Sequence, residues 1–390
     1  MSRNDNRPSA PLDPQTELVT SGRDTVAQKG FINPPIVRGS TVLYPTAEDL
    51  HAHRGEFQYG RHGTPTTRAL QDVMMALEGP QCAGVGIAPS GLAAISTTLM
   101  SVTKAGDHIL VCDNVYRPSR NFCNGVLARY GVETTYFDPK IGAAIEALFK
   151  PNTRAVLVEA PGSQSFEMPD IPAIVEVAHA RGALVAVDNT FATPLLQQPL
   201  VLGADVVMHS ATKYFGGHSD VMGGALAFAR RDELAERVLH YRHVTGGVLA
   251  PFNAWLILRG LRSMPARLAW HCRNARAVAE FLASRPEVER VNWPGLPGHA
   301  NHAVAKAQMR DFGGMLSVEM RGGREAALRL ASRLKLFTNA TSLGGVESLV
   351  EHRASVEGEH PHSPQSLLRF SVGLEHPDDL VEDLRQGLAG

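Results

Sequence analysis

The segment HSATKYFGGHSDVMGG, residues 209–224, places a lysine shortly after a serine and a threonine, at the point where an apolar run ends. The chain has 31 arginines and only seven lysines, so Lys213 stands out from the charges of the surface. A lysine in a buried setting loses its proton readily and can then form a Schiff base with an aldehyde. The hydroxyls of Ser210 and Thr212 are expected on one side of an extended strand, where both can face one phosphate group.

Further residues able to do chemistry follow the other apolar runs. A helix N-terminus binds anions through its free N–H groups, a carboxylate can keep a pyridine nitrogen protonated, and an aromatic ring can stack on a flat cofactor. The candidates are Ser90, Gly91, Tyr116, Gly162, Ser163 and Asp188. Taken singly, each has an ordinary structural alternative, such as a helix cap, a turn cap or a packed aromatic ring. Together with the lysine they are the parts that a pyridoxal phosphate site requires.

The elements that must position these groups alternate along the chain. The apolar runs are GVGIAP, HILVCD, AVLVEAP, ALVAVD, DVVMHS and GALAFA, and helical segments such as IPAIVEVAHARG lie between them. This alternation predicts a mostly parallel α/β sheet with helices on both faces. Because ligands of such sheets bind outside the carboxyl ends of the strands, the candidate residues are expected to converge on one edge.

Three parts of the chain are expected from the spacing of these elements. Residues 1–63 form an arm that proline, glycine and polar residues break often, 64–247 form the α/β domain, and 248–390 form a smaller α+β domain. The last part opens on a long helical stretch that Pro265 is expected to kink or break. It contains HRASVEGEHPHSPQS, which is interpreted as a polar loop, and closes on a strand followed by a helix.

Composition favours small-molecule chemistry. With 390 residues, 44% of them hydrophobic, the chain can bury a sizeable core, and its net charge of −1 offers no field for nucleic acid or a membrane surface. The polar N-terminus has no apolar signal core, and no apolar run approaches the ~20 residues of a spanning helix, so a cytoplasmic location is expected. The four cysteines show no ligand spacing, and neither a disulfide nor a metal site is expected.

Nine long motifs cover nearly the whole chain: GFINPPIVRGSTVLY, EFQYGRHGTPTTRALQ, APSGLAAI, ILVCDNVYRPSRNFC, VEAPGSQSFEMPDI, VAVDNTFATP, SATKYFGGHSDVMGG, TSLGGVESL and LLRFSVGLE. They resemble the pyridoxal-phosphate enzymes of cysteine and methionine metabolism, and within that family the cystathionine β-lyases. The resemblance implies an aminotransferase-like (fold type I) α/β domain and pyridoxal 5'-phosphate as the cofactor. It also implies a homotetramer whose active sites are shared between subunits.

Roles for individual residues follow from this resemblance. The implied catalytic residues are Lys213, Tyr116 and Tyr59; the implied cofactor-binding residues are Lys213, Asp188, Tyr116, Ser210, Thr212, Gly91, Leu92, Tyr59 and Arg61; the implied substrate-binding residues are Arg369, Ser342 and Ser163. Among them, Tyr59 and Arg61 match residues that reach into the phosphate site of a neighbouring subunit. The arginine at 369 matches the one that holds the substrate α-carboxylate, for which a bidentate guanidinium is well suited.

The implied reaction is cleavage of the Cβ–S bond of L-cystathionine to homocysteine, pyruvate and ammonia, a transsulfuration step of methionine biosynthesis. Gly162 and Ser163 favour it, since several γ-enzymes have asparagine at this place, and Thr341 stands where several γ-elimination enzymes have glutamate. Leu343 and Val346 point instead to the γ-lyases and γ-synthases. The alternative is therefore a methionine γ-lyase, cystathionine γ-lyase or cystathionine γ-synthase, and the breadth of sulfur substrates stays open. A non-catalytic binding protein is disfavoured by the intact lysine, aspartate, tyrosine and arginine set.

Overall fold

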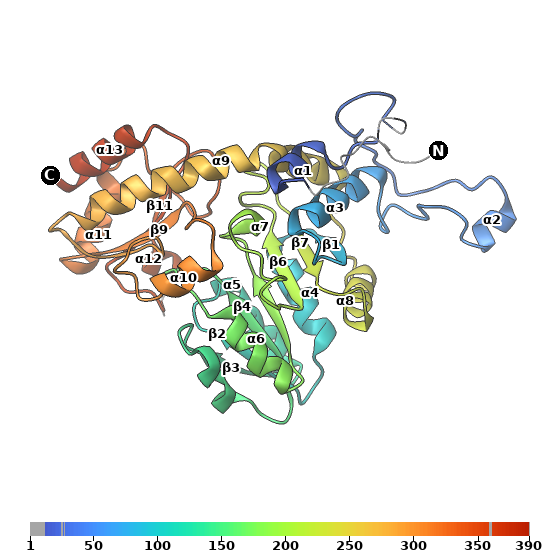
Figure 1. Cartoon of the computed structure of the whole chain (residues 1–390), viewed down its shortest axis with the longest axis horizontal. Helices are drawn as coiled ribbons and strands as arrows, with labels where there is room; N and C mark the ends of the chain where they lie inside the picture. Colours follow the sequence, from blue (N-terminus) through green and yellow to red (C-terminus); the bar gives the residue numbers. More distant parts are fainter. Residues whose placement is uncertain (1–11, 25, 27, 359–360, 390) are drawn as a thin grey trace.

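The computed structural model describes residues 12–24, 26, 28–358 and 361–389, in which two sheets are connected by one long helix (Figure 1). The larger sheet has the strands β1 (Gly84–Ala88), β2 (His108–Cys112), β3 (Glu133–Phe137), β4 (Thr153–Glu159), β5 (Leu184–Asp188), β6 (Val206–Ser210) and β7 (Gly224–Phe228). Their order is β1-β7-β6-β5-β4-β2-β3, and only β7 runs antiparallel to its neighbours. The mostly parallel sheet expected from the sequence is confirmed.

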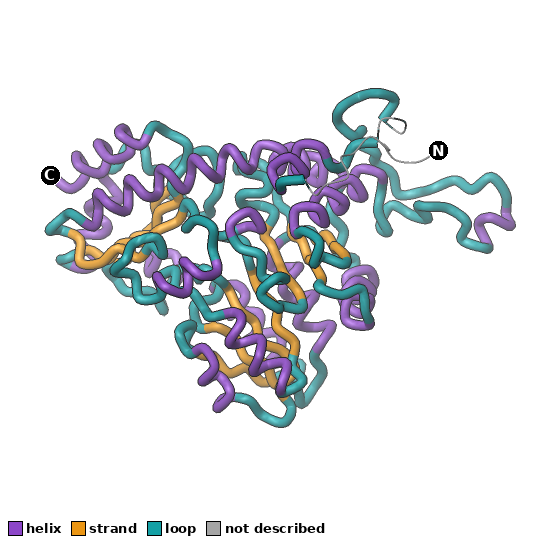
Figure 2. Tube along the Cα trace, in the orientation of Figure 1, coloured by secondary structure: helices purple, strands orange, loops and turns teal. Residues whose placement is uncertain are grey.

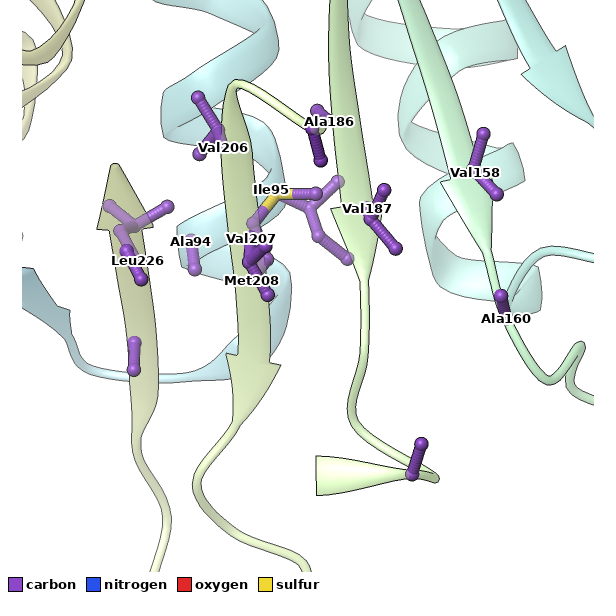
Figure 3. Packing of buried hydrophobic residues seen from close by; sticks show 14 of the residues in the cluster. Ala94, Ile95, Val158, Ala160, Ala186, Val187, Val206, Val207, Met208 and Leu226 are labelled. Carbon is purple, nitrogen blue, oxygen red and sulfur yellow. The ribbon is translucent and has the colours of Figure 1, made fainter. Parts of the chain in front are cut away.

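Apolar strands and helices form the core around this sheet. Every residue of β2 and β7 is buried, as parallel sheets covered on both faces require. Helix α4 (Gly91–Val102) packs on β6 and β7, and α6 (Ile171–Ala180) packs on β4 and β5. Figure 3 shows Ala94 and Ile95 of α4 behind the strand that carries Val207 and Met208. The central strands are thereby held rigidly where they deliver residues to the sheet edge.

The smaller sheet lies in the C-terminal part of the chain. Its strands are β8 (Val288–Asn292), β9 (Met315–Met320), β10 (Thr338–Asn339), β11 (Leu349–His352) and β12 (Leu367–Ser371), in the order β10-β11-β12-β9-β8. All pairs are antiparallel except β10 with β11. Helices α11 (Gly323–Arg333) and α13 (Pro377–Ala389) contribute to a second buried core over this sheet.

Helix α9 (Pro251–Ala283) connects the two sheets, and it continues unbroken through Pro265. The expected break does not occur because buried residues on both sides of the proline, among them Leu261 and Leu268, anchor the helix in the core. The first part of α9 packs with the large sheet and its last turns pack with the small one. The domain boundary near residue 248 therefore stays a proposal.

The N-terminal part contains α1 (Pro14–Thr20), α2 (Ala47–His51) and α3 (Pro65–Glu78). Helix α1 buries Leu18 against α3 and α9, whereas the segment that carries α2 projects from the body of the molecule (Figure 2). Apolar side chains on this segment are exposed, including Phe31 at 75% and Leu43 at 89%. Among the described residues, nothing covers the apolar side chains Phe31 and Leu43 of the projecting segment.

The remaining helices are short. They are α5 (Arg117–Phe122), a π-helical turn (Cys123–Leu127), a 3-10 helix (Gly142–Leu148), α7 (Thr193–Leu196), α8 (Glu233–Val244), α10 (His302–Gln308) and α12 (Arg353–Glu357). Helix α12 lies inside the stretch interpreted as a polar loop, and it forms because its arginine and glutamate are buried in ion pairs. The four cysteines are buried thiols. No helix among the described residues has the length and apolar character needed to cross a bilayer.

Candidate active site

The carboxyl ends of the parallel strands lie at one edge of the large sheet, and many candidate residues gather there. Asp188 and Ser210 are the last residues of β5 and β6. Gly91 begins α4 shortly after β1, Tyr116 precedes α5 after β2, and Ser163 follows β4. This edge is where open α/β sheets bind their ligands.

Lys213 lies in the turn after β6, and its side chain is half-buried. Its Nζ atom donates a hydrogen bond of 2.9 Å to the hydroxyl oxygen of Ser342. Burial, with the positive charge of Arg369, lowers the pKa of Lys213 to about 8, although Glu351 and Asp188 oppose the change. A substantial share of the amine is therefore neutral, and nucleophilic, at slightly alkaline pH.

The loop that carries Ser342 passes closely over the residue after the lysine. Ser342 has a backbone φ of +97°, in the region that L-residues rarely adopt. A Cβ atom on Gly344 would lie 2.8 Å from the backbone nitrogen of Tyr214, so only glycine fits at that crossing. Leu343 is buried, and Val346 is 38% exposed at the end of the loop. The loop of residues 342–346 is thus held against the turn that contains Lys213.

Asp188 is held by a residue that the sequence did not single out. Its Oδ1 atom accepts hydrogen bonds from the backbone N–H of Thr190 at 3.0 Å and from the Thr190 hydroxyl at 2.5 Å. The same hydroxyl accepts the backbone N–H of Ser210 at 2.7 Å. Burial raises the pKa of Asp188, against the effect of these hydrogen bonds. A cation placed beside the carboxyl would favour its ionised form.

The N-terminus of α4 lies directly against Ser210. A Cβ atom on Gly91 would lie 2.6 Å from the Cβ of Ser210, so glycine is required for this approach. Ser90 caps the helix by accepting the N–H of Ala93 at 3.1 Å, and the N–H groups of the first residues, Gly91 and Leu92, have no acceptor within an α-helix. A small anion is well matched to such a helix end beside a serine hydroxyl.

Thr212 differs from its expected position. Strand β6 ends at Ser210, so Thr212 lies in the following turn rather than two residues along the same strand. Its hydroxyl donates to the carbonyl of Gly223 at 3.2 Å and accepts the N–H of that glycine at 3.1 Å. The expectation that the hydroxyls of Ser210 and Thr212 lie on one side of the same strand was therefore wrong, since it requires both residues to be in extended backbone.

Arg369 lies on β12 opposite Glu351 of β11 and forms an ion pair with it. Its Nη1 atom also donates to the backbone carbonyl of Ser163 at 3.2 Å, which connects the small sheet to the segment after β4 of the large sheet. Arg353 lies 3.2 Å from both Glu351 and Glu357, and all these ionic side chains are buried. Sequence reasoning missed this support because it lies in and beside the stretch interpreted as a loop.

Glu159 is a further residue that sequence reasoning missed. It ends β4, is 1% exposed, and its Oε2 atom accepts the backbone N–H of Tyr116 at 2.6 Å. The Tyr116 residue itself is 40% exposed. A glutamate at the end of the apolar run AVLVE was the available signal, because a buried charge without a function is costly.

Tyr59 and Arg61 are not brought to the lysine within this chain. Arg61 donates from Nη1 to the backbone carbonyl of His243 at 2.9 Å, at the end of α8, and Tyr59 is 45% exposed. Both residues belong to the part of the chain that includes the projecting segment. A role in the site of another subunit therefore stays a proposal.

The groups at the sheet edge fit pyridoxal phosphate. The N-terminus of α4 and Ser210 match its phosphate, the partly neutral amine of Lys213 matches its aldehyde, and Asp188 matches its ring nitrogen, which is a cation when protonated. Arg369 is the buried guanidinium that suits the carboxylate of an amino acid. Among the described residues, no group of three or more metal-ligating side chains is present.

Residues 15–389 match the family described as "Cys/Met metabolism PLP-dependent enzyme". A cystathionine gamma-synthase of Mycobacterium bovis is 43% identical over 380 residues, covering 96% of each chain. A relative from Rhizobium johnstonii, named provisionally as a cystathionine beta-lyase, is 42% identical and covers 96% of this chain and 95% of its own. An L-methionine gamma-lyase of Fusobacterium nucleatum is 40% identical, covering 92% and 94%.

A solved structure has the same overall fold. It is described as the crystal structure of metB from Corynebacterium glutamicum and superposes with a TM-score of 0.92, at 39% sequence identity. The similarity covers 97% of this chain and 99% of that one. The aminotransferase-like fold expected from the sequence is thereby confirmed.

Proposed function

The chain belongs to the Cys/Met metabolism PLP-dependent enzymes, whose cofactor is pyridoxal phosphate, and we propose that it acts at the γ-carbon of its amino-acid substrate. In this proposal the enzyme replaces or eliminates the γ-substituent of a four-carbon amino acid. It joins cysteine to an O-acylhomoserine to give cystathionine, or it cleaves the bond between sulfur and Cγ in cystathionine. Cleavage at the β-carbon becomes the second candidate.

The preference for the γ-carbon over the β-carbon rests on Leu343 and Val346. They follow Ser342, the hydrogen-bond partner of Lys213, and so belong to the loop that is fixed against the lysine turn. Aliphatic residues at these two places resemble γ-lyases and γ-synthases, whereas enteric β-lyases have tryptophan and tyrosine there. The relatives named as a γ-synthase and a γ-lyase, at 43% and 40% identity, support the same choice.

A specific observation favours β-elimination as the second candidate. A Cβ atom on Gly162 would lie 2.0 Å from Nδ2 of Asn114, so the structure has no room for a side chain at this position. The Gly162-Ser163 pair stands at the place where several γ-enzymes have asparagine, and it resembles β-lyases. In that reading the products from cystathionine are homocysteine, pyruvate and ammonia.

The proposed roles of the residues follow from their contacts. The bound cofactor supplies an electron sink that allows the Cα–H bond of the substrate to break. Lys213 takes the Cα proton on Nζ, which must be neutral for this step, and the hydroxyl of Ser342 holds that nitrogen in place. Arg369 binds the α-carboxylate. For γ-chemistry a second proton has to leave the adjacent Cβ, so Nζ must first release the Cα proton before it can act as the base again.

We further propose that the active enzyme is a homo-oligomer in which Tyr59 and Arg61 complete the site of a neighbouring subunit. The exposed apolar residues of the projecting segment, such as Phe31 and Leu43, support this because no other part of the described structure covers them. Their burial against a second copy would place the arm residues close to that copy.

The test of the γ-assignment is a replacement assay. The protein is incubated with pyridoxal phosphate, an O-acylhomoserine and L-cysteine, and the products are identified by mass. Formation of cystathionine in the wild type, and none with Lys213→Ala, supports the proposal. If the wild type gives no γ-product but releases pyruvate from L-cystathionine, the β-lyase assignment replaces it.

A further inference from the structure

Two carboxyl groups lie side by side at the centre of the candidate site. Glu159 ends β4 and Asp188 ends β5, and the two residues are direct partners in the register of these parallel strands. Side chains at the same level of neighbouring strands point to the same face of a sheet. Both are buried, with exposures of 1% and 8%. The site therefore contains a second acidic group that the reaction described above does not use.

The two carboxyls have different hydrogen-bond partners. Asp188 accepts two hydrogen bonds from Thr190, including one from its hydroxyl. Glu159 accepts the backbone N–H of Tyr116, which is 43 residues away in the sequence, and the hydroxyl of Ser163 faces the same carboxyl. Tyr116 precedes α5 and makes no side-chain cap for that helix. The Glu159 carboxyl thus connects the end of β4 to the backbone of Tyr116, the residue that carries the aromatic ring.

The charges around the pair favour one ionised group and one neutral group. Burial raises the pKa of Glu159 to about 8, and the negative charge of Asp188 adds to this effect. The other charged or titratable groups that face Glu159 are Arg369 from β12 and the buried thiol of Cys112 from β2. Because Lys213 and His209 lie near Asp188 and favour its carboxylate, whereas Arg369, the cation that faces Glu159, is already paired with Glu351, the proton belongs on Glu159.

We propose that Glu159 is a positioning residue with two tasks: its carboxyl anchors the backbone of Tyr116, and its proton keeps the negative charge of the pair on Asp188. Asp188 is then the single carboxylate that faces the ring nitrogen of the cofactor. Glu159 touches neither the substrate nor the reacting atoms. The proposal rests on the cofactor of the family and is independent of whether the β- or the γ-carbon loses its substituent.

Three variants separate the two tasks. Glu159→Gln keeps a carbonyl acceptor for the Tyr116 N–H and stays neutral at every pH, whereas Glu159→Ala removes the acceptor. Glu176→Gln, on the exposed side of α6, is the matched control for a glutamate-to-glutamine change. Since glutamine has nearly the same shape as glutamate, the first variant is expected to fold even if the alanine variant does not.

The proton is tested on the protein without cofactor, by infrared spectroscopy. A protonated carboxyl absorbs separately from a carboxylate, so the wild type at neutral pH is expected to show a carboxylic acid band that fades as the pH rises through about 8. The band is expected to be lost in Glu159→Gln and kept in Glu176→Gln. A wild-type band that Glu159→Gln leaves unchanged, or the absence of any band, overturns the assignment of the proton.

Thermal unfolding of the same proteins gives a second test. A carboxyl whose pKa is raised in the folded state contributes stability that is present below its unfolded pKa, near 4.5, and is lost as the pH rises toward about 8. The melting temperature of the wild type is therefore expected to fall relative to Glu159→Gln across this window. A constant difference between the two proteins overturns the assignment of the proton.

The anchor is tested by the dissociation constant of pyridoxal phosphate. Loss of a buried hydrogen bond is expected to weaken binding in Glu159→Ala roughly tenfold, because the Tyr116 backbone is released. Glu159→Gln is expected to stay within about threefold of the wild type, since its carbonyl replaces the acceptor. Wild-type affinity in the alanine variant, or equal weakening in both variants, contradicts the anchor.

Discussion

The Nζ atom of Lys213 donates a 2.9 Å hydrogen bond to the hydroxyl of Ser342, a residue 129 positions later whose backbone φ is +97°. A non-glycine residue in this region costs on the order of 1–3 kcal/mol and persists only where the surrounding structure enforces it. Here Gly344, which fits against the backbone of Tyr214, fixes the loop. The strained residue is thus the one that holds the amine of the lysine.

Two substitutions of Ser342 separate the effect of its backbone strain from the effect of its hydroxyl group. Ser342→Ala keeps the positive φ, whereas Ser342→Gly relieves it, so the glycine variant is expected to be more stable by about 1 kcal/mol. Both are expected to lower kcat roughly tenfold, since each removes the hydrogen bond to Lys213. Thermal melts and steady-state kinetics check this, and a wild-type kcat in Ser342→Ala would argue against the tether.

Capture of the cofactor by the free protein is expected to depend on the proton of Lys213. Because the pKa of this amine is lowered to about 8, the rate of adduct formation with pyridoxal phosphate should rise as the pH increases through that value. The pH dependence of stability has the same direction. The lowered pKa of Lys213 contributes fully to the stability of the folded protein above the unfolded pKa near 10.5, and this contribution is lost as the pH falls through about 8. Stopped-flow absorbance measures the rate.

The control for this measurement is Lys306→Ala, which removes an exposed lysine of α10. It should leave the pH dependence unchanged, whereas Lys213→Ala should abolish the adduct. A midpoint near the value of a solvated lysine in the wild type would mean that Lys213 is not desolvated as its burial indicates.

Several parts of the site could be predicted because they end apolar runs. Asp188 ends β5 and Lys213 follows β6, two strands that are mostly apolar and buried, so a charged residue there was visible in the sequence. Ser342 was implied only through resemblance, since its contact with Lys213 depends on how two distant loops pack. Thr212 was misplaced because the end of β6 at Ser210 cannot be read from residue types.

The C-terminal part was harder to predict. Arg353 and Glu357 belong to a short helix in which their buried ionic groups pair with each other and, for Arg353, with Glu351 outside the helix, and no local periodicity signals this. Pro265 was expected to kink or break its helix, and the break does not occur because local propensity was outweighed by packing along α9. Glu159 was readable as a charge at the end of an apolar run, but its partner Tyr116 lies on another element.

The buried ion pairs around Arg369 predict a large effect of removing their shared carboxylate. Glu351→Gln leaves Arg353 and Arg369 buried with less compensation, and we expect a loss of about 3–5 kcal/mol in the free energy of unfolding. The KM for the amino-acid substrate should rise as Arg369 loses its orientation. Denaturant unfolding and kinetics measure both effects.

Glu382→Gln is the matched control for Glu351→Gln, because the partner of Glu382 is the exposed Arg385 on the same helix. Exposed ion pairs contribute little, so neither stability nor KM should change measurably. If Glu351→Gln behaved like this control, Glu351 would not be supporting Arg369.

Arg61 is expected to act on the cofactor of a neighbouring subunit. Arg61→Ala should raise the dissociation constant of pyridoxal phosphate roughly tenfold, since a charged hydrogen bond to phosphate is lost. Within its own chain Arg61 contacts both the backbone carbonyl and the ring of His243, and His243→Ala removes only the contact with the ring. Equilibrium dialysis compares the two variants, and unchanged affinity in Arg61→Ala would leave this residue with a purely structural role.

The keto acid released from L-cystathionine tests the central claim most directly. Purified protein with pyridoxal phosphate is incubated with this substrate, and the products are identified by mass. Action at the γ-carbon predicts 2-oxobutyrate and cysteine, in agreement with the γ-type residues Leu343 and Val346. Pyruvate and homocysteine as products would contradict the claim. They would mean that Gly162 and Ser163, rather than Leu343 and Val346, indicate which carbon loses its substituent.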